Sequence, residues 1–471
     1  MKYYSDVKTS EFESRPRELP LRRFVSAPIC LIVFPASLLV AQSAIAQNPI
    51  KQSTVVQAIP IRLLGAPEAV SSSTVSGVTG VRELSDGRVL VNDAGNRRVI
   101  VYDKALSNFT VVADSSSATH NLYGKRATMI IPYTGDTTLL IDVGARAFLV
   151  MSPAGKVTRV MSPPRPNDLA MMGADNGRPG FDGNGNIIYR ATLFPSFKAP
   201  VAGKAYEAPS MPDSSPILRG DFNKRSADTI AWVRIPKMRI TVTSIAGGGV
   251  TLSPVVNPLA NIDDWTMLPD GTVAVLRGQD YHLEWFNANG THTSSAKMPF
   301  DWKRLTDEEK NAIIDSTKKA VAKLAQPTSA TNADGATSHG APAGGGHGMT
   351  IMPITPGDGG PPPQVGMSTN NAIPLIPEVG PASDLPDYMP PVMRSGQMKT
   401  DNDGNVWILP STSSQSGGGL LYDVVNRNGE IFQRVRIPAG RALEGFGSNG
   451  AIYLTSHEGG IAHLERVHMR H

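Results

Sequence analysis

Cysteine is almost absent from this chain. Its 471 residues include one cysteine, Cys30, so neither a disulfide framework nor a thiolate metal cluster can form within one chain. Charge of one sign is lacking too: 45 lysines and arginines against 41 aspartates and glutamates leave a net charge of +4, which does not favour nucleic-acid binding. What is abundant is 45 glycines and 38 prolines, the poorest helix formers. The composition favours strands joined by many turns.

The N-terminal segment has the pattern of an export signal. Basic residues precede a short apolar run at 29–41, and Ala44-Ile45-Ala46 has the A-x-A form of a cleavage site. We expect residues 1–46 to be a signal peptide and the mature protein to be secreted or periplasmic. An uncleaved membrane anchor is the alternative, although the run is shorter than the ~20 residues that cross a bilayer. We expect no transmembrane helix in the mature chain.

The mature chain repeats one pattern of turns and strands. A glycine turn, mostly Asp-Gly or Asn-Gly, precedes an aliphatic strand, a polar loop and another strand. The turn glycines are Gly87, Gly135, Gly185, Gly271, Gly404 and Gly450. Three of the steps between them are 46 to 50 residues long, which suits a four-stranded propeller blade. The pattern predicts an all-β, six-bladed β-propeller, because stacked blades bury both faces of each sheet.

The first unit carries the most specific signal. After the Asp86-Gly87 turn come a strand at Val89–Val91, a polar loop at Asn92–Asn96 that contains Asp93, and a strand at Arg98–Tyr102; Asn96-Arg97-Arg98 has the form N-x-R. This order of turn, aspartate, N-x-R and strand resembles the NHL repeat. The other units keep the turn and the strands but lack the N-x-R. The resemblance implies a six-bladed propeller over most of 58–471 and transfers little about function.

The last unit contains only three strands. We expect the extended N-terminal segment Ala58–Leu64 to supply its missing outer strand and so to close the last blade, because an open sheet edge is a liability. One domain, 47–471, would then carry two insertions, at about 192–228 and 299–397. The first is proline-rich and is expected to be irregular.

The second insertion combines a helix with a low-complexity segment. Thr306 and Glu309 form a capping box that opens an amphipathic helix to about Leu324. We expect the apolar face of this helix to dock on the propeller; a separate protein partner is the alternative. Residues 326–371 are rich in Gly and Pro and poor in apolar residues, so we expect them to be disordered.

Polar side chains follow the second strand of several units, on the face where propellers usually bind ligands. Four arginines there can clamp a carboxylate or phosphate, because guanidinium binds both in a bidentate manner. Pairing with nearby aspartates, or capping of backbone carbonyls, is the structural alternative. The candidate ligand-binding residues are Asp93, Asn96, Arg97, Asp142, Arg146, Arg190, Arg277 and His457.

A metal site is a second interpretation of the same face. Asp93, Asn96, Asp142 and Asp280 offer oxygen ligands for Ca²⁺, and propeller lactonases and lyases hold a cation on their axis. The ligand set of those enzymes cannot be matched here residue by residue. No nucleophile, zinc or nucleotide motif is present either. We therefore expect no cofactor and assign no catalytic residue, with Ca²⁺ as the alternative.

Three functions stay open. The leading one is an exported, monomeric, non-enzymatic propeller that binds a protein partner or a small anionic ligand on its loop face. The alternatives are a cation-dependent enzyme similar to lactonases or lyases, and a structural or scaffold protein of the cell envelope. Nothing in the sequence suggests nucleic acid as a partner. Fold alone does not choose between these functions.

Overall fold

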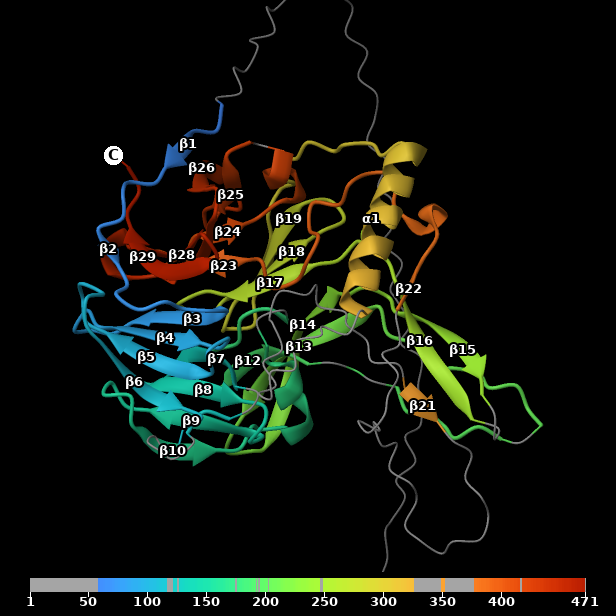
Figure 1. The fold of residues 1–471 in the computed structure, drawn as a ribbon, viewed down its shortest axis with the longest axis horizontal. Coiled ribbons are helices and arrows are strands. Elements are labelled where there is room, and N and C mark those ends of the chain that lie inside the picture. Colours follow the sequence, from blue (N-terminus) through green and yellow to red (C-terminus); the bar gives the residue numbers. More distant parts are fainter. Residues whose placement is uncertain are drawn as a thin grey trace, which may run out of the picture. The chain divides into compact units, whose positions relative to one another are not determined.

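The structure is a computed structural model in which most of the chain after residue 57 is described. The described ranges are 58–116, 122–124, 127–173, 176–191, 193, 195–201, 203–245, 249–325, 349–351, 377–415 and 417–470. The expected signal peptide, 1–46, lies outside them, as do residues 326–348 and 352–371 of the segment expected to be disordered. Within the described ranges the chain is mostly strands, with one α-helix (Figure 1).

Six sheets are antiparallel meanders that follow one another along the chain. The first consists of β3 (Val78–Glu83), β4 (Val89–Asp93), β5 (Arg98–Tyr102) and β6 (Phe109–Asp114). The second consists of β7 (Ala127–Pro132), β8 (Thr138–Asp142), β9 (Ala147–Met151) and β10 (Val157–Met161). The third consists of β11 (Gly180–Phe181), β12 (Ile187–Arg190), β13 (Ser214–Asp221) and β14 (Ser226–Arg234).

The next three sheets continue the same order. One consists of β17 (Asp264–Met267), β18 (Val273–Arg277), β19 (His282–Phe286) and β20 (His292–Ser294). The next consists of β23 (Lys399–Thr400), β24 (Val406–Ile408), β25 (Gly419–Val425) and β26 (Ile431–Pro438). The last contains β27 (Arg441–Phe446), β28 (Ile452–Glu458) and β29 (Ile461–Val467). Short 3-10 helices occur at Pro166–Met171, Ala382–Asp384, Ser411–Gln415 and Ser448–Gly450.

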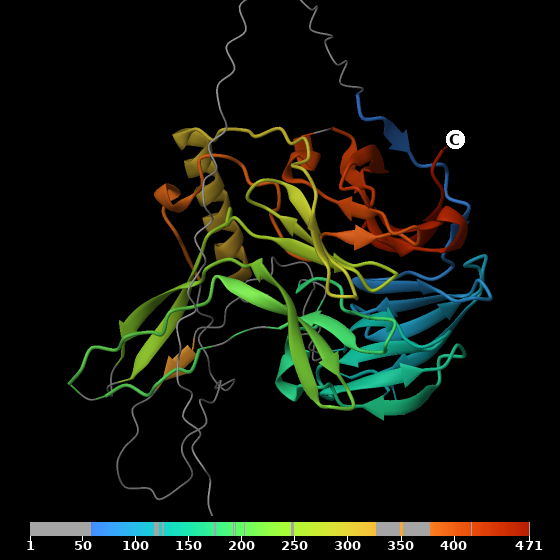
Figure 2. The same ribbon diagram turned by 180° about the vertical axis from the view of Figure 1, so that it is seen from behind.

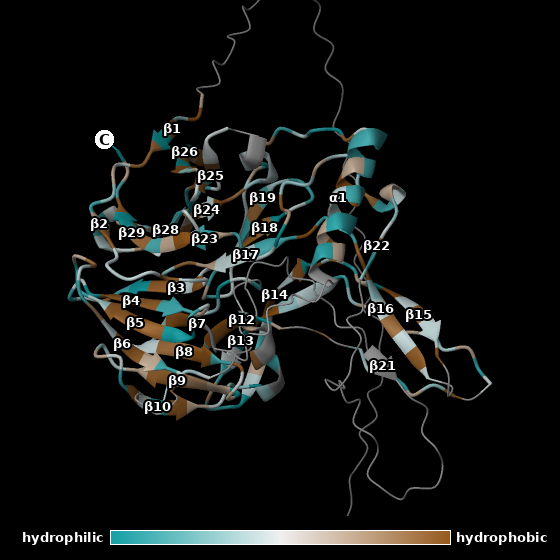
Figure 3. Cartoon of the chain, viewed as in Figure 1, coloured by the Kyte–Doolittle hydropathy of each residue, from teal (hydrophilic) through white to brown (hydrophobic). Residues whose placement is uncertain are grey.

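The predicted turns join the first and second strands of these sheets. At Gly87, for example, φ is +84°, a conformation that glycine adopts without steric cost. The other predicted turn glycines also have positive φ: Gly135, Gly185, Gly271, Gly404 and Gly450. The turn prediction is therefore confirmed at each position. Apolar residues follow the strands in Figure 3, for example along β5, β12 and β18.

Neighbouring sheets contact each other through their first strands. A Cβ added at Gly80 in β3 would lie 2.7 Å from Ile130 Cγ1 in β7, so the absence of a side chain allows the two strands to approach. Gly445 in β27 likewise lies close to the carbonyl of Val81 in β3. Between the second strands, Leu90 and Leu140 share a buried cluster. Four-stranded antiparallel sheets packed in this way are consistent with the predicted propeller.

The N-terminal segment pairs with the C-terminal strands, but its two strands join different sheets from the one expected. β1 (Ile61–Leu63) adds a parallel fifth strand to the β23–β26 sheet, beside β26, and β2 (Ala69–Val70) pairs antiparallel with β29. The expectation that Ala58–Leu64 supplies the outer strand of the last sheet is therefore wrong. The small side chain of Ala69 is buried against that sheet, whereas Ile61 and Leu63 are each 48% exposed. The apolar pattern of Ala58–Leu64 misled the prediction.

The first insertion is shorter than expected. β13 and β14 occupy 214–234, so the irregular part lies between β12 and β13 rather than reaching residue 228. β13 pairs with both β12 and β14 even though it contains Pro216, and its Ile217 and Leu218 are buried. The proline content suggested a loop, but burial of these two side chains favours a strand.

A further sheet was not predicted. β15 (Arg239–Ser244) and β16 (Val250–Val256) form an antiparallel hairpin, to which β21 (Met349–Ile351) and β22 (Glu378–Val379) add on the β16 edge. Both ribbon views show the hairpin extending away from the other sheets (Figures 1 and 2). β21 lies within the segment 326–371 that was expected to be disordered, so that expectation is wrong at these three residues.

The helix α1 (Asp307–Ala325) forms as predicted. The Thr306 hydroxyl accepts the Glu309 N–H at 3.2 Å, and the Glu309 carboxylate accepts the Thr306 N–H at 3.0 Å, which completes the capping box. Ile314 is buried in a cluster with Leu259, Leu305 and Leu385. The helix therefore docks on its own chain. In the described part of the chain, no helix combines the length and apolar character that a membrane crossing requires.

Candidate functional site

Several predicted site residues hold their own loops together. The buried carboxylate of Asp93 accepts the Ser76 N–H at 2.7 Å, the Asn96 side-chain amide at 2.9 Å and the Arg98 Nε–H at 2.7 Å. Asp142 occupies the same place after β8, where it accepts the Ala145 N–H at 2.9 Å. The structural alternative holds for these aspartates, because their oxygens stabilise the loops.

The predicted arginines differ in their surroundings. Arg97 and Arg146 each lie directly before the third strand of their sheet, and their φ angles are +52° and +53°. They therefore occupy equivalent positions at the ends of two loops. Arg277 is neutralised by Asp263 at 2.8 Å and Glu284 at 2.5 Å. His457, near the end of β28, is exposed. Of the predicted residues, Arg190 alone belongs to the group of charged residues described next.

The residues of the metal interpretation have protein partners. Asp93 and Asp142 are used by their loops, and Asp280 pairs with His282 at 2.6 Å. Across the described ranges, no three His, Cys, Asp or Glu side chains gather in a way that could hold a metal ion.

Charged side chains do meet where the innermost strands come together. Arg178 lies just before β11, while Asp264 and Lys399 are the first residues of β17 and β23. Arg178 Nη2 donates to the backbone carbonyl of Glu444, in β27, at 2.8 Å. The bond joins the segment before β11 to the sheet of β27–β29, and these lie far apart in the sequence. We call the following residues the central cluster: Arg178, Arg190, Asp264, Lys399, Tyr422 and Glu444.

Asp264 organises the segment that delivers Lys399. Its carboxylate is buried and accepts the backbone N–H groups of Gly396 at 2.7 Å, Gln397 at 2.8 Å and Met398 at 2.9 Å, and also that of Trp265 at 2.9 Å. Burial raises the pKa of Asp264, although these N–H donors favour its ionised form. Because both oxygens are used, Asp264 offers little acceptor capacity to any further group.

Lys399 has no structural partner among the described residues: the amine makes neither a hydrogen bond nor an ion pair there. The side chain is half-buried. Burial, and after it the positive charge of Arg178, lower the pKa of Lys399 to about 7, while Glu444 and Asp264 act in the opposite direction. Near neutral pH the amine is therefore divided between its charged and neutral forms.

Both arginines of the cluster carry a charge, and Arg190 retains an unused donor among the described residues. Burial lowers the pKa of both Arg178 and Arg190, but each stays charged at neutral pH. Arg190 donates through Nη1 to Ser395 Oγ at 3.3 Å and through Nη2 to Asn176 Oδ1, while its buried Nε–H has no partner within the described structure. An unpaired buried donor is costly, so such a group indicates a missing acceptor.

Glu444 and Tyr422 complete the cluster. Glu444 Oε1 accepts the Thr455 hydroxyl at 2.7 Å, which leaves its other oxygen without a protein donor among the described residues. Tyr422 is buried, and burial together with the charge of Glu444 raises its pKa, so its O–H stays neutral. Three basic side chains thus face two carboxylates, one of which is occupied by backbone amides. The unmet requirement of the cluster is for an acceptor of hydrogen bonds.

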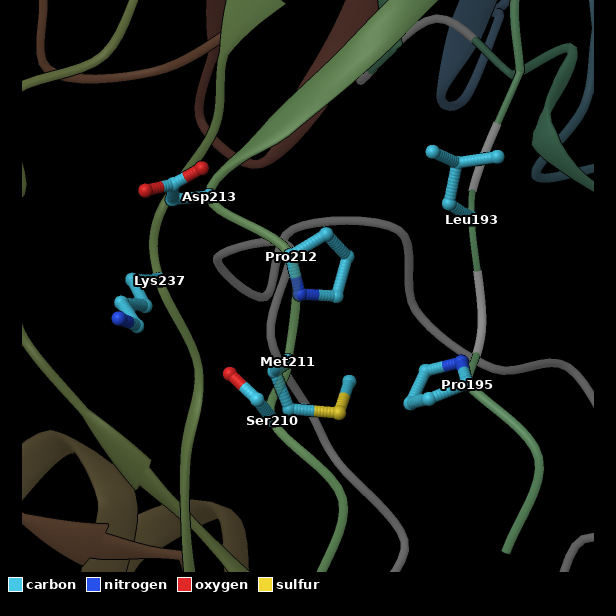
Figure 4. A pocket seen from close by; sticks show the side chains of 7 residues that line it. All are labelled: Leu193, Pro195, Ser210, Met211, Pro212, Asp213 and Lys237. Carbon is cyan, nitrogen blue, oxygen red and sulfur yellow. The ribbon is translucent and has the colours of Figure 1, made fainter.

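A pocket of about 420 Å³ lies elsewhere, beside the irregular segment between β12 and β13. Figure 4 shows Asp213 and Lys237 on one side of it, and Leu193 and Pro195 on the other. It contains none of the central cluster, and we assign it no role.

Sequence reasoning missed most of the central cluster because it examined the loops after the second strands. A usable signal was nevertheless present. Arg178, Asp264, Lys399 and Glu444 each lie five to seven residues before a turn glycine, on or just before a first strand. In a propeller, first strands lie nearest the axis, so charged residues at that spacing indicate groups that converge at the centre.

No protein-family model and no curated protein matches the chain. Among solved structures, a gluconolactonase of Xanthomonas campestris is similar with 9% identity, 88% of this chain and 99% of that chain covered, and a TM-score of 0.38. A virginiamycin B lyase of Staphylococcus aureus has 7% identity, 84% and 97% coverage and a TM-score of 0.34. TolB of Acinetobacter baumannii is similar with 8% identity, 83% of this chain and 64% of that chain covered, and a TM-score of 0.31. These are propeller-type proteins, but such distant likeness says nothing about activity.

Proposed function

We propose that this protein is a six-bladed propeller whose centre binds a small organic anion. The observation that carries the proposal is the set of unused donors in the central cluster. Lys399 has no hydrogen-bonded partner in the described structure, and the buried Nε–H of Arg190 has none there either. Arg178 contributes a third cation at the same place. An anion supplies the acceptor that Lys399 and the Arg190 Nε–H lack, with hydrogen bonds strengthened by charge.

A single carboxylate suits the cluster better than a polyanion. Glu444 lies against the same basic groups and would repel a multiply charged phosphate more strongly than a carboxylate. Its charge leaves the cluster with a small positive excess. We therefore infer that the ligand is a small monocarboxylate, bound between Arg178 and Lys399. Arg190 lies beside Asp264 and contributes a second guanidinium.

Calorimetric titration of the full chain with glycolate tests this proposal. We expect glycolate to bind, its uncharged methyl ester not to bind, and Arg178→Gln to weaken glycolate binding at least about tenfold, since hydrogen bonds to charged groups contribute roughly 1.5–3 kcal/mol. Lys224→Gln is the matched control, because the side chain of Lys224 is 80% exposed and lies outside the cluster. Equal binding of acid and ester, or unchanged affinity in Arg178→Gln, would contradict the proposal.

We also propose that the protein is exported, because of the basic segment, the apolar run and the A-x-A site near its N-terminus. N-terminal sequencing of protein produced in a bacterium should then find Gln47 as the first residue of the mature chain. Retention of residues 1–46 on the purified protein would favour the uncleaved anchor instead.

A further inference from the structure

We infer that Lys399 is a nucleophile whose amine forms an imine with the carbonyl carbon of a small α-keto or aldehyde acid held by Arg178. This inference rests on the proposed function, because it takes the same anion site and names the substrate class. It goes further by assigning a covalent step to one residue.

A comparison within the chain shows that Lys399 is not used for structure. Lys310 is also largely buried, and its ammonium pairs with the carboxylate of Asp387 at 2.9 Å. Lys399 has no such pair among the described residues, although Glu444 and Asp264 are near enough to act on its charge. Burying an unpaired ammonium is costly, and among the described residues Glu444 and Asp264 offset only part of this cost. A lysine kept in such a place is one whose amine is free to react.

The surroundings of Lys399 hold it in place. Asp264 binds the three backbone amides of 396–398, so the chain entering β23 is fixed immediately before the lysine. Thr400, the next residue, donates its hydroxyl to the carbonyl of Met267 at 2.9 Å. The backbone of Lys399 is therefore anchored on both sides, which fixes the point from which its amine reaches a substrate.

The charges around the amine favour its reactive form. Burial and the cation of Arg178 lower the pKa of Lys399 from 10.5 to about 7. About half of the amine is then neutral at pH 7, against roughly one part in three thousand for an amine with the ordinary pKa. Desolvation and a neighbouring cation are the two ways in which proteins activate lysine for imine formation.

The reaction balances without an oxidant or a cofactor. The neutral amine of Lys399 adds to the carbonyl carbon, and the carbonyl oxygen becomes a hydroxyl by taking up a proton that the nitrogen releases. The nitrogen then gives up its second proton, the hydroxyl leaves as water, and a carbon–nitrogen double bond remains. Glu444 is the carboxylate next to the amine that can accept and return these protons. The carboxylate of the substrate stays with Arg178 throughout.

Reductive trapping tests the inference directly. The full chain is incubated at pH 7 with glyoxylate and cyanoborohydride, which reduces an imine to a stable amine, and the modified lysines are located by peptide mass mapping. We expect a carboxymethyl group on Lys399 at least about tenfold faster than on Lys224, because far more of its amine is neutral. Equal rates at Lys399 and at exposed lysines such as Lys224 would overturn the inference.

Two variants separate this inference from the proposed function. Lys399→Arg cannot form the imine, so we expect it to give no fast trapping at position 399. Arg178→Gln should slow trapping at Lys399 at least about fivefold, because the acid is no longer held beside the amine. If the unmodified chain binds glycolate but Lys399 is not trapped, the imine is wrong and the anion site stands. If glycolate does not bind, the proposed function fails as well.

Discussion

Replacing Lys399 by methionine is expected to stabilise the protein, with a gain that depends on pH. In the folded protein the pKa of Lys399 is about 7, against 10.5 for a free lysine. Below about pH 7 both states carry the charge, and the folded state bears the full cost of burying it. Between pH 7 and 10.5 the cost declines, because the folded amine is already neutral. Above 10.5 both states are neutral and the cost is gone.

The expected gain in the free energy of unfolding for Lys399→Met is on the order of 3 kcal/mol at about pH 6, falling towards zero near pH 10, allowing for the part of the side chain that water reaches. Urea unfolding at both pH values measures it. Lys224→Met, at an exposed site, should show no such dependence. A Lys399→Met protein that is less stable than the parent at pH 6 would mean that the ammonium is paired or solvated. A residue that lowers stability where it stands is typical of a functional site.

Replacing Asp264 by alanine is expected to cause a large loss of stability. The carboxylate accepts N–H groups from Gly396, Gln397 and Met398, and from Trp265. Without it, these amides lose their acceptor in a buried place, which we expect to reduce the free energy of unfolding by about 3–5 kcal/mol. Asp264→Asn retains one acceptor oxygen and should cost roughly half as much.

Hydrogen exchange distinguishes this local effect from general destabilisation. In Asp264→Asn, the amides of 396–398 should lose protection first, and glycolate affinity should fall because Lys399 is no longer fixed. Asp86→Ala is the control, since the side chain of Asp86 is 50% exposed and pairs only with Arg88 in the described structure. Unchanged protection at 396–398 would show that Asp264 does not hold this segment.

The repeated turns were predictable because their conformation depends on local chemistry. A glycine with positive φ between two aliphatic strands needs no distant partner, and Gly87 and Gly271 both have φ of +84°. The capping box of α1 is local as well, since Thr306 and Glu309 satisfy each other's backbone N–H groups. Such features can be found from a few adjacent residues.

What depended on distant pairing was predicted less well. Ala58–Leu64 and Ala69–Val70 are both extended, and only the room available beside β29 decides that the small Ala69 enters that sheet. Pro216 suggested a loop, but its strand is central because Ile217 and Leu218 find partners in neighbouring sheets. Packing between sheets decides which segment pairs with which strand, and the hydrophobic periodicity of the sequence does not show that packing.

The central cluster was missed for the same reason. Arg178 and Glu444 lie far apart in the sequence, and only the arrangement of the sheets brings them to 2.8 Å through Nη2 and the backbone carbonyl. The arginines that the sequence favoured lie on loops, where Arg277, for example, is neutralised by its neighbours. Arg190 is both a candidate from the sequence and a member of the central cluster, because it ends the second strand β12.

A crystal structure of the protein grown with glycolate tests the central claim most directly. The account predicts the carboxylate within hydrogen-bonding distance of both Arg178 and Lys399, among the innermost strands. Glycolate bound only in the pocket between Leu193 and Lys237, or a central cluster holding nothing but water at saturating glycolate, would contradict it.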